Sequence, residues 1–163
     1  MSNTGNLDDG VEIRDAGGKG DGVFATRRFR LSDTVLVGRV VGRLEGNTAH
    51  ATQVGRHKYV LMGGAMPKVN HSCDPNCGCG FGPSGTYSFV ARRALEPGEE
   101  ITFDYAMRNW SIEHFPSHCQ CGSRLCRGRV TGWKDLPPER KAAYDGLVAP
   151  YLLEMDREAG HPG

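Results

Sequence analysis

The sequence predicts a mostly β fold in a single domain, with a helical segment only near the C-terminus. The 163 residues include 23 glycines and 9 prolines, which favour many turns and short strands over a helical bundle. Hydrophobic residues make up 38% of the chain, which is typical of a globular protein with a core and argues against disorder. Apolar residues recur at helical spacing only from Asp135 onward.

Short β-branched and aromatic runs mark the predicted strands. In chain order they span residues 11–14, 23–25, 35–41, 57–62, 86–91 and 101–105. The glycine-rich stretches 17–22 and 78–85 are predicted to be loops, and residues 45–56 to be irregular. A glycine loop lets the backbone approach a ligand closely, although such a loop is more often a plain turn. Residues 96–99 have proline and glycine where a type II turn needs them.

The C-terminal segment is predicted to be a helix that a proline interrupts. Asp135 stands where a helix cap is expected, and Pro137 and Pro138 would occupy the first turn. Pro150 must kink or split this helix. The apolar stripe, which we expect to pack on the sheets, consists of Ala143, Tyr144, Leu147, Val148, Tyr151, Leu152 and Met155.

Composition and charge exclude several classes of protein. The net charge of +1 gives no general attraction to nucleic acid or to an anionic membrane, so we expect neither as a partner. The first nine residues have no basic start and no apolar run, so no secretory signal is expected. Six cysteines without such a signal indicate a reducing compartment, which means the cytoplasm, or the nucleus in a eukaryotic cell.

Three motifs far apart in the chain are predicted to meet and form one active site. The central one is Asn70-His71-Ser72-Cys73-Asp74-Pro75-Asn76-Cys77, a polar turn with cysteines between two apolar runs. The others are Gly98-Glu99-Glu100-Ile101-Thr102-Phe103-Asp104-Tyr105 and Cys119-Gln120-Cys121-Gly122-Ser123-Arg124-Leu125-Cys126.

The cysteine triplet Cys119, Cys121 and Cys126 predicts a structural zinc site. Zinc in such sites takes four soft ligands in a tetrahedron, so one more ligand must come from elsewhere. The polar residues between these cysteines cannot bury the thiols in a core, which disfavours three unliganded thiols on a surface loop. The spacing leaves the fourth ligand open among Cys73, Cys77, Cys79, His114 and His118.

These motifs resemble those of SET-domain protein lysine methyltransferases that carry a post-SET zinc segment. Residues 70–77 are similar to the central motif of that family, and residues 98–105 to its second motif, which bears the catalytic tyrosine. Gly20-Asp21-Gly22 followed by Val23-Phe24-Ala25 resembles its glycine motif, and the cysteine triplet resembles the post-SET segment. The resemblance runs from about Glu12 to Arg129.

The resemblance implies a fold and a division of the chain. The fold is SET-like (β-clip-like): small, mostly antiparallel sheets, a knot-like threaded C-terminal segment, a zinc-bound knuckle and a C-terminal helical segment. The implied parts are a disordered tail (1–10), the SET domain (11–115), the post-SET zinc segment (116–130) and a C-terminal helical extension (131–163).

The resemblance also implies the cofactor site and the catalytic residues. S-adenosylmethionine would be held by Gly20, Asp21, Gly22, Asn70, His71, Tyr105 and Gln120. Tyr105 would be catalytic, and Phe103 would stand where the family has Phe or Tyr, a choice that influences how many methyl groups are added. We expect the backbone of His71 to matter more than its imidazole. Asp21 stands where the family often has Trp, and Lys68 lies in the run where it often has Arg.

For the metal, the resemblance implies one zinc ion held by Cys77, Cys119, Cys121 and Cys126. Cys73 would then be a packing residue and Cys79 a spare thiol.

The implied activity is methyl transfer to the ε-amine of lysine in a protein or peptide, histone-like or other. One alternative is a methyltransferase of small amines or short peptides, because the region that usually helps to select the substrate is short here, roughly residues 45–56. A second alternative is a zinc-stapled binding module without catalysis.

Two further features each have two interpretations. Glu96, Glu99, Glu100 and Asp104 either attract a basic peptide or form a solvated turn and strand edge. Trp133 either covers the cofactor or the substrate channel, or anchors the C-terminal helix, and we favour the anchor.

Overall fold

The computed structural model describes residues 9–46, 48, 51–81, 87–112 and 118–160. The predicted tail 1–10 therefore lies outside the described residues except for Asp9 and Gly10. The strands are β1 Val11–Asp15, β2 Asp21–Ala25, β3 Thr34–Val37, β4 Val40–Leu44, β5 Thr52–Gly55, β6 Lys58–Met62, β7 Asn70–His71, β8 Cys77–Phe81, β9 Tyr87–Ala91 and β10 Glu100–Phe103. The α-helices are α1 Pro138–Ala143 and α2 Pro150–Glu158, and the 3₁₀ helices are η2 Gly17–Lys19, η3 Met66–Lys68, η4 Tyr105–Met107 and η5 Trp133–Asp135.

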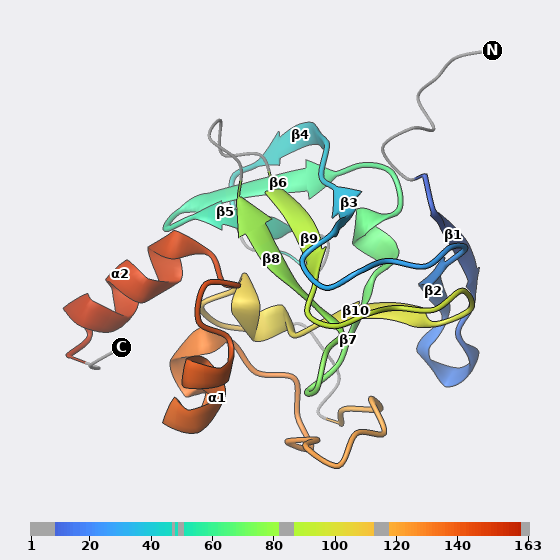
Figure 1. Cartoon of the computed structure of the whole chain (residues 1–163). Coiled ribbons are helices and arrows are strands. Elements are labelled where there is room, and N and C mark those ends of the chain that lie inside the picture. The colour runs from blue at the N-terminus through green and yellow to red at the C-terminus, as the bar shows by residue number, and fades with distance from the viewer. Residues whose placement is uncertain (1–8, 47, 49–50, 82–86, 113–117, 161–163) are drawn as a thin grey trace.

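The described strands form three small sheets, in the orders β1-β2-β10-β7, β3-β9-β8 and β4-β6-β5 (Figure 1). Neighbouring strands are antiparallel except for β7 and β10, which run parallel. The predicted fold class, mostly β with small antiparallel sheets and few helices, is confirmed. The knot-like threading stays a prediction.

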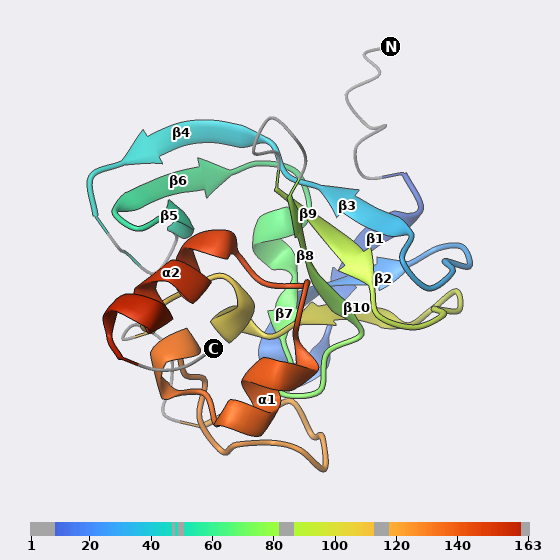
Figure 2. The ribbon, with the colours of Figure 1, turned by 60° about the vertical axis from the view of Figure 1, so that its left-hand side comes forward.

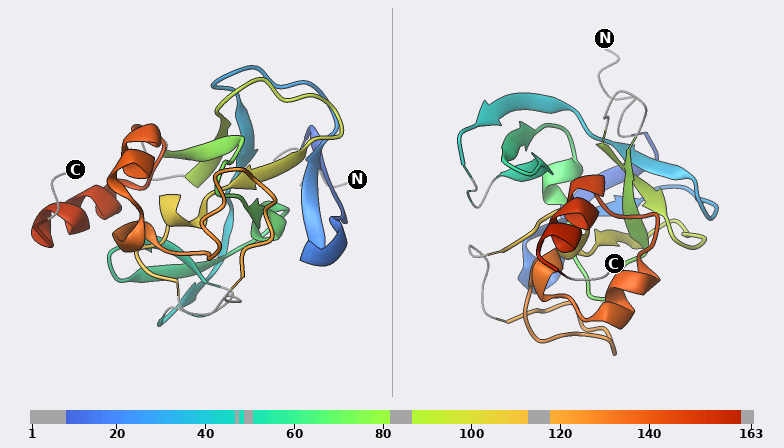
Figure 3. Two further views of the ribbon diagram at one scale, coloured as in Figure 1. Left: turned by 90° about the horizontal axis from the view of Figure 1, so that it is seen from below. Right: turned by 90° about the vertical axis from the view of Figure 1, so that its left-hand side faces the viewer.

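The hydrophobic core lies where the sheets and the C-terminal helices meet (Figure 2). Its largest fully buried side chains include Phe29, Phe89, Leu95, Ile101, Phe103, Trp133, Tyr144 and Leu152. They come from every part of the described chain, so the C-terminal segment shares the core with the sheets. The helices lie on one side of the molecule and the β1–β2 hairpin on the opposite side (Figure 3).

Residues 35–41 do not form the single buried strand that was predicted. Gly38 and Arg39 separate β3 from β4, and Val40 and Val41 are 54% and 59% exposed at the edge of their sheet. A Cβ on Gly38 would lie 2.3 Å from Met62 Cε and 3.0 Å from the Tyr87 carbonyl oxygen, so a side chain here would force these neighbours to shift. The β-branched residues do form strands, but these are two separate strands in two different sheets.

Two stretches predicted to lack regular structure contain strands. Residues 45–56 include β5, and the predicted loop 78–85 begins with the last four residues of β8. The glycines of β8 make room for neighbours: a Cβ on Gly78 would lie 2.6 Å from Leu147 Cβ, and one on Gly80 2.8 Å from Val90 Cγ2. Glycine here marks close packing instead of a turn.

The turn before β10 forms as predicted. Gly98 has φ +92°, and the Glu99 N–H donates to the Glu96 carbonyl at 3.2 Å. β10 ends at Phe103, because the Asp104 carboxylate accepts the Ala106 N–H and so begins η4.

The C-terminal helices differ from the prediction where the first of them begins. Asp135 lies in η5 and caps no helix, while α1 begins after Pro137. Pro150 opens α2, so the segment is split into two helices, one of the two outcomes predicted, and Gly146 at φ +79° turns the chain between them. None of the described helices has the length and apolar character to cross a membrane.

Candidate active site and metal centre

The parallel pair of β7 and β10 joins the first two motifs. Asn70 lies opposite Thr102 and His71 opposite Phe103, and the Ser72 N–H donates to the Phe103 carbonyl at 3.0 Å. These residues are about thirty positions apart in the chain, yet their side chains share one end of the sheet. The predicted meeting of the central and second motifs is confirmed.

The side chain of Asn70 ties this pair to the glycine loop. Its Nδ2 donates to the Asp21 carbonyl at 2.9 Å and to Glu100 Oε1 at 3.0 Å. A Cβ on Gly22 would lie 2.6 Å from that same Glu100 oxygen and 2.9 Å from Ala16 Cβ, so a side chain at this position of β2 would push its neighbours away. The Asn70 amide therefore holds the loop to the centre of the molecule.

The loop itself is open and lies beside the third motif. Gly20 has φ +78°, and no atom beyond its chain neighbours lies within 4 Å of the point where its Cβ would stand. A Cβ on Gly18 would lie 3.6 Å from Gln120 Oε1, so the Gln120 side chain reaches the loop. The Lys68 ammonium lies 3.5 Å from Asp21 Oδ2. The structure thus places the side chains of Asn70 and Gln120, two of the predicted cofactor residues, beside the glycine-rich stretch.

Tyr105 follows β10 and turns its phenol toward the central motif. The hydroxyl donates to the Val69 carbonyl at 3.2 Å, directly before Asn70. Its ring lies 4.9 Å from the Phe103 ring and 5.2 Å from the His71 ring, centroid to centroid. Burial raises the pKa of Tyr105, so the hydroxyl keeps its proton near neutral pH.

Phe103 is 1% exposed and belongs to the core as well as to this site. Its ring packs on Phe89 at a centroid distance of 4.5 Å, and the Arg108 guanidinium carbon lies 4.7 Å from its centroid. Core packing therefore fixes the position of the Phe103 ring, which in turn contacts the Tyr105 ring.

The imidazole of His71 makes two directed contacts. The Tyr105 N–H donates to Nδ1 at 3.1 Å, and Nε2 lies 3.4 Å from Cys73 Sγ. Since Nδ1 accepts a hydrogen bond, the proton of the neutral ring is on Nε2 and points at the sulfur. Burial lowers the pKa of His71 to about 4, so the ring is neutral at physiological pH. The ring thus links Tyr105 to Cys73, and the expectation that the His71 backbone matters more than its imidazole stays a prediction.

Four cysteines gather into one cluster, Cys73, Cys119, Cys121 and Cys126, with all sulfurs within 4.8 Å of one another. The Cys73 and Cys119 sulfurs are 3.8 Å apart. Four sulfurs placed about 2.3 Å from a tetrahedral zinc ion lie about 3.8 Å from each other, so the cluster can hold one zinc ion. The Arg127 N–H donates to Cys73 Sγ at 3.3 Å, as expected beside a thiolate ligand.

The assignment of Cys77 as the fourth ligand is wrong, and so is the packing role given to Cys73. Cys77 begins β8, opposite Ala91 of β9, and is fully buried in the hydrophobic core. Cys79, predicted to be a spare thiol, is also buried, with its sulfur 2.7 Å from the Tyr87 hydroxyl. The chain bends at residues 73, 74 and 76, and of these two cysteines only Cys73 joins the post-SET triplet.

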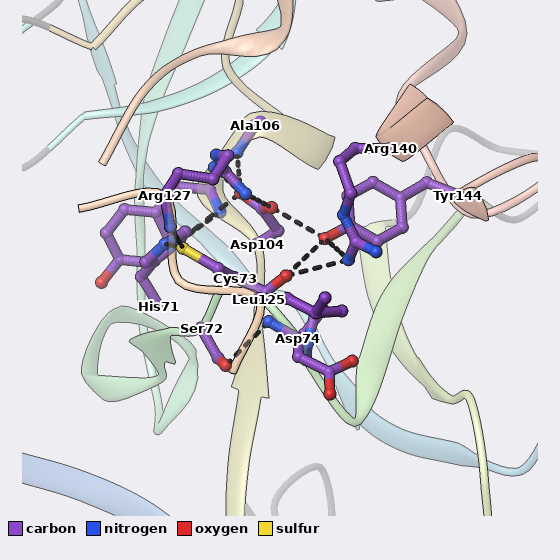
Figure 4. Close-up of polar contacts among 12 residues, drawn as sticks. His71, Ser72, Cys73, Asp74, Asp104, Ala106, Leu125, Arg127, Arg140 and Tyr144 are labelled. Atoms are coloured by element: carbon purple, nitrogen blue, oxygen red, sulfur yellow. Dashed lines mark hydrogen bonds and ion pairs between the residues drawn. The ribbon is translucent and has the colours of Figure 1, made fainter. Parts of the chain in front are cut away.

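Asp104 is the main residue of this region that sequence reasoning missed. Neither interpretation of the four acids fits it, because it is 0% exposed and accepts two hydrogen bonds from Arg127, at 2.7 and 3.1 Å. The Tyr144 hydroxyl donates to its Oδ2 at 2.8 Å (Figure 4). Two features of the sequence could have indicated this ion pair. Asp104 directly precedes the predicted catalytic Tyr105, and Arg127 directly follows the last cysteine of the triplet.

Glu99 and Glu100 also have partners. Glu99 pairs with Arg93 at 2.9 Å, and Glu100 with Lys19. Trp133 is 1% exposed, and its indole N–H donates to Asp156 of α2, so it anchors the helix as favoured.

A model of the SET domain matches residues 20–106, just over half of the chain. The chain belongs to the SET-domain family. The matched region of this SET domain contains the glycine motif, Asn70, His71, Phe103 and Tyr105, and ends before the cysteine triplet.

Three relatives illustrate the similarity. Histone-lysine N-methyltransferase ash1 of Drosophila melanogaster is 40% identical over 97 residues, which cover 53% of this chain and 4% of that protein. Histone-lysine N-methyltransferase ATXR3 of Arabidopsis thaliana is 43% identical over 74 residues, which cover 41% of this chain and 3% of that protein. An H3 lysine-36 specific histone-lysine N-methyltransferase of Yarrowia lipolytica is 29% identical over 142 residues, which cover 75% of this chain and 18% of that protein. The SET chain thus matches only a small part of each relative.

A solved structure shows the same fold. The crystal structure of KRYPTONITE in complex with mCHH DNA, H3(1-15) peptide and SAH covers 74% of this chain and 29% of its own, at a TM-score of 0.58 and 21% sequence identity.

Proposed function

We propose that this SET protein transfers a methyl group from S-adenosylmethionine to the ε-amine of a lysine in a protein or peptide. The observation that supports this most is the position of the Tyr105 phenol. It lies beside the Val69 carbonyl, next to the Asn70-His71 pair, with the Phe103 ring 4.9 Å away. A phenol and a phenyl ring at this point provide a polar contact and an apolar wall for an incoming amine.

The residues present fit the proposed cofactor, which supplies an activated methyl group when bound. Its methionine end carries an ammonium and a carboxylate. Asn70 Oδ1 has no donor among the described residues and can accept from the ammonium, and Lys68 beside the glycine loop offers a cation for the carboxylate. The open surface at Gly20 leaves room for close approach, and Gln120 Oε1 reaches the same loop. We also assign His71 and Tyr105, whose rings contact each other, to the cofactor site. We assign the backbone of residues 20–22 to the same site.

Methyl transfer requires a neutral amine aligned with the methyl group. A free lysine titrates near ~10.4, and an apolar channel lowers that value because it disfavours the ammonium. The Phe103 and Tyr105 rings supply such a surface. The Tyr105 hydroxyl gives its proton to the Val69 carbonyl, so its oxygen would accept an N–H of the amine and leave the amine lone pair to attack the methyl group. Alignment alone is worth about 7–11 kcal/mol in favourable cases. These residues thus act by desolvation and orientation.

A structural zinc would hold the post-SET segment against the site. Burial raises the pKa of Cys119 to about 11 and that of Cys73 further, so both are neutral thiols in the absence of metal. A bound zinc ion replaces those protons. Because Gln120 lies between Cys119 and Cys121, the cluster would also fix a cofactor contact.

The relatives support a lysine-bearing protein as the substrate. Their names describe histone-lysine methyltransferases, and KRYPTONITE was crystallised with an H3(1-15) peptide. The region 45–56 is short and contributes β5, Thr52–Gly55, to a three-stranded sheet, which supports a short peptide or small amine as the second candidate. Location in the cytoplasm, or in a eukaryotic nucleus, stays a prediction.

The decisive test is mass spectrometry of candidate substrates, together with the Tyr105→Phe variant. We expect the wild-type protein to add methyl groups to lysines of a histone or peptide library. Tyr105→Phe should lower turnover by about a hundredfold or more, within the range found for a single directed group. Cofactor binding, measured by calorimetry, should survive. Tyr59→Phe makes the same chemical change in β6 and should leave both values unaltered.

Each other outcome selects a different function. Label on small amines but on no protein would favour the second candidate. Cofactor binding without turnover on any acceptor would favour a non-catalytic binding module. Full turnover by Tyr105→Phe would remove Tyr105 from the mechanism.

A further inference from the structure

The carboxylate of Asp104 is the best-partnered buried group of the described chain, and it directly precedes Tyr105. It accepts the Ala106 N–H at 3.0 Å, two bonds from Arg127 at 2.7 and 3.1 Å, and the Tyr144 hydroxyl at 2.8 Å. The first of these begins η4, the 3₁₀ turn that contains Tyr105. Any shift of this carboxylate therefore moves the backbone that carries the Tyr105 ring.

Two of the groups in this network come from the C-terminal extension, outside the matched SET region. Arg140 of α1 donates from Nη2 to the Tyr144 hydroxyl at 3.0 Å and to the Cys73 carbonyl at 2.9 Å. The Tyr144 hydroxyl has one proton, which it gives to Asp104 at the shorter distance. Arg140 thus supports both the phenol and the backbone of a metal ligand (Figure 4).

The contacts of the Tyr144 hydroxyl and the Arg140 guanidinium are more than α1 would need to pack against the sheets. Tyr144 is 0% exposed, and the guanidinium carbons of Arg92 and Arg140 lie 5.0 and 5.1 Å from its ring centroid. A helix that only needed an apolar anchor would bury Phe here at no polar cost. The hydroxyl instead satisfies a buried carboxylate, and an unsatisfied carboxylate would be costly.

We propose that Tyr144 and Arg140 are positioning residues of the SET site. They hold the Asp104 carboxylate and the Cys73 backbone in place. Through these two residues they set the orientation of Tyr105 and the position of one ligand of the zinc cluster. The C-terminal extension is then part of the active machinery and not an independent appendage. The effect on turnover depends on the proposed methyltransferase function, but the effect on the metal site does not.

The extension offers a matched control. Arg56 pairs with Glu158 of α2 and also ties the extension to the sheets, with side chains that are 38% and 58% exposed. Arg56→Ala removes this tether without touching Asp104 or Cys73. A variant that acts only through loosened helices should behave like Arg56→Ala.

The experiment compares Tyr144→Phe, Arg140→Met, Arg140→Lys and Arg56→Ala in the full zinc-loaded chain. We measure kcat and the KM for S-adenosylmethionine, the melting temperature, and the rate of zinc release to a colorimetric chelator. Tyr144→Phe should lower kcat about tenfold while that KM stays within about twofold, because one bond to a buried charge is lost. Arg140→Met should release zinc at least about fivefold faster, since the Cys73 carbonyl loses its donor. Arg140→Lys should regain part of this loss, and Arg56→Ala should change neither value.

Two results would overturn the proposal. One is zinc release from Arg140→Met at the rate of Arg56→Ala. The other is a kcat for Tyr144→Phe that equals the Arg56→Ala value at equal melting temperature. If the wild-type chain transfers no methyl group, the methyltransferase function fails by itself, and the zinc-release comparison still decides the proposal.

Discussion

Cys73 and Cys77 belong to one motif, four residues apart, yet they lie in opposite environments. The Cys73 sulfur meets the Arg127 N–H, the His71 ring and the Cys119 sulfur, all within 3.8 Å. Cys77 is enclosed by the apolar core at the start of β8, and burial raises its pKa to about 12. The same side chain is prepared for a metal at one position and kept as a neutral core thiol at the other.

Asn76 separates the two environments. Its Nδ2 donates to the Glu100 carbonyl at 2.7 Å, and its Oδ1 accepts the Thr102 N–H at 2.9 Å. The Asn76 amide therefore makes the hydrogen bonds to the β10 backbone that a neighbouring strand would otherwise make, just before the chain enters β8. What distinguishes the two cysteines is which distant segment reaches them. Local composition is nearly the same for both.

The largest expected effect is on the metal, and it tests the comparison directly. Wild-type protein should contain about one zinc per chain, as a four-ligand site requires. Cys73→Ala should retain almost none after dialysis, because three thiolates leave the site open to competing chelators. Cys77→Ala should keep the full content and lose about 1–2 kcal/mol of unfolding free energy as a buried small apolar group. Elemental analysis by plasma mass spectrometry gives the metal content.

A zinc-free wild-type protein would break the comparison, since both cysteines would then be plain thiols. Loss of metal from Cys77→Ala at an unchanged melting temperature would reverse the two roles.

A smaller effect is expected on the core side of the motif. Gly78→Ala would place a Cβ 2.6 Å from Leu147 Cβ, in the segment whose carbonyl accepts the Cys79 N–H at 2.9 Å. We expect a loss of about 1–3 kcal/mol in unfolding free energy from overpacking, measured by urea denaturation, with full zinc content. Gly46→Ala, where the Cβ meets nothing within 4 Å, should stay within about 0.5 kcal/mol of wild type. Equal stability of the two variants would show that β8 does not need its glycines.

The sequence predicted the elements better than it predicted how they meet. The hydrophobic runs placed most strands, and the predicted meeting of the central and second motifs is realised by the pairing of β7 with β10. Glycine misled at residues 78–81, because its missing side chain serves close packing there and not a turn. Cys73 and Cys77 could not be separated by spacing, since the choice depends on how the post-SET segment crosses the sheet. Both interpretations of the four acids missed the burial of Asp104, because its partners Arg127 and Tyr144 lie 23 and 40 residues away.

The smallest expected effect is at Phe103, where the two environments touch. Its ring packs on Phe89 in the core and on Tyr105 in the proposed site, at 4.5 and 4.9 Å. Phe103→Tyr adds one hydroxyl to this wall, which narrows the space for an amine that already carries methyl groups. We expect the product distribution, read by mass spectrometry, to shift toward lower methylation while zinc content stays at about one. Phe89→Tyr adds the same atom one layer deeper, and it should reduce stability without changing the products, because Phe89 is 0% exposed and lies behind Phe103. Unchanged products from Phe103→Tyr would assign this ring to the core alone and move the boundary between the two regions to Tyr105.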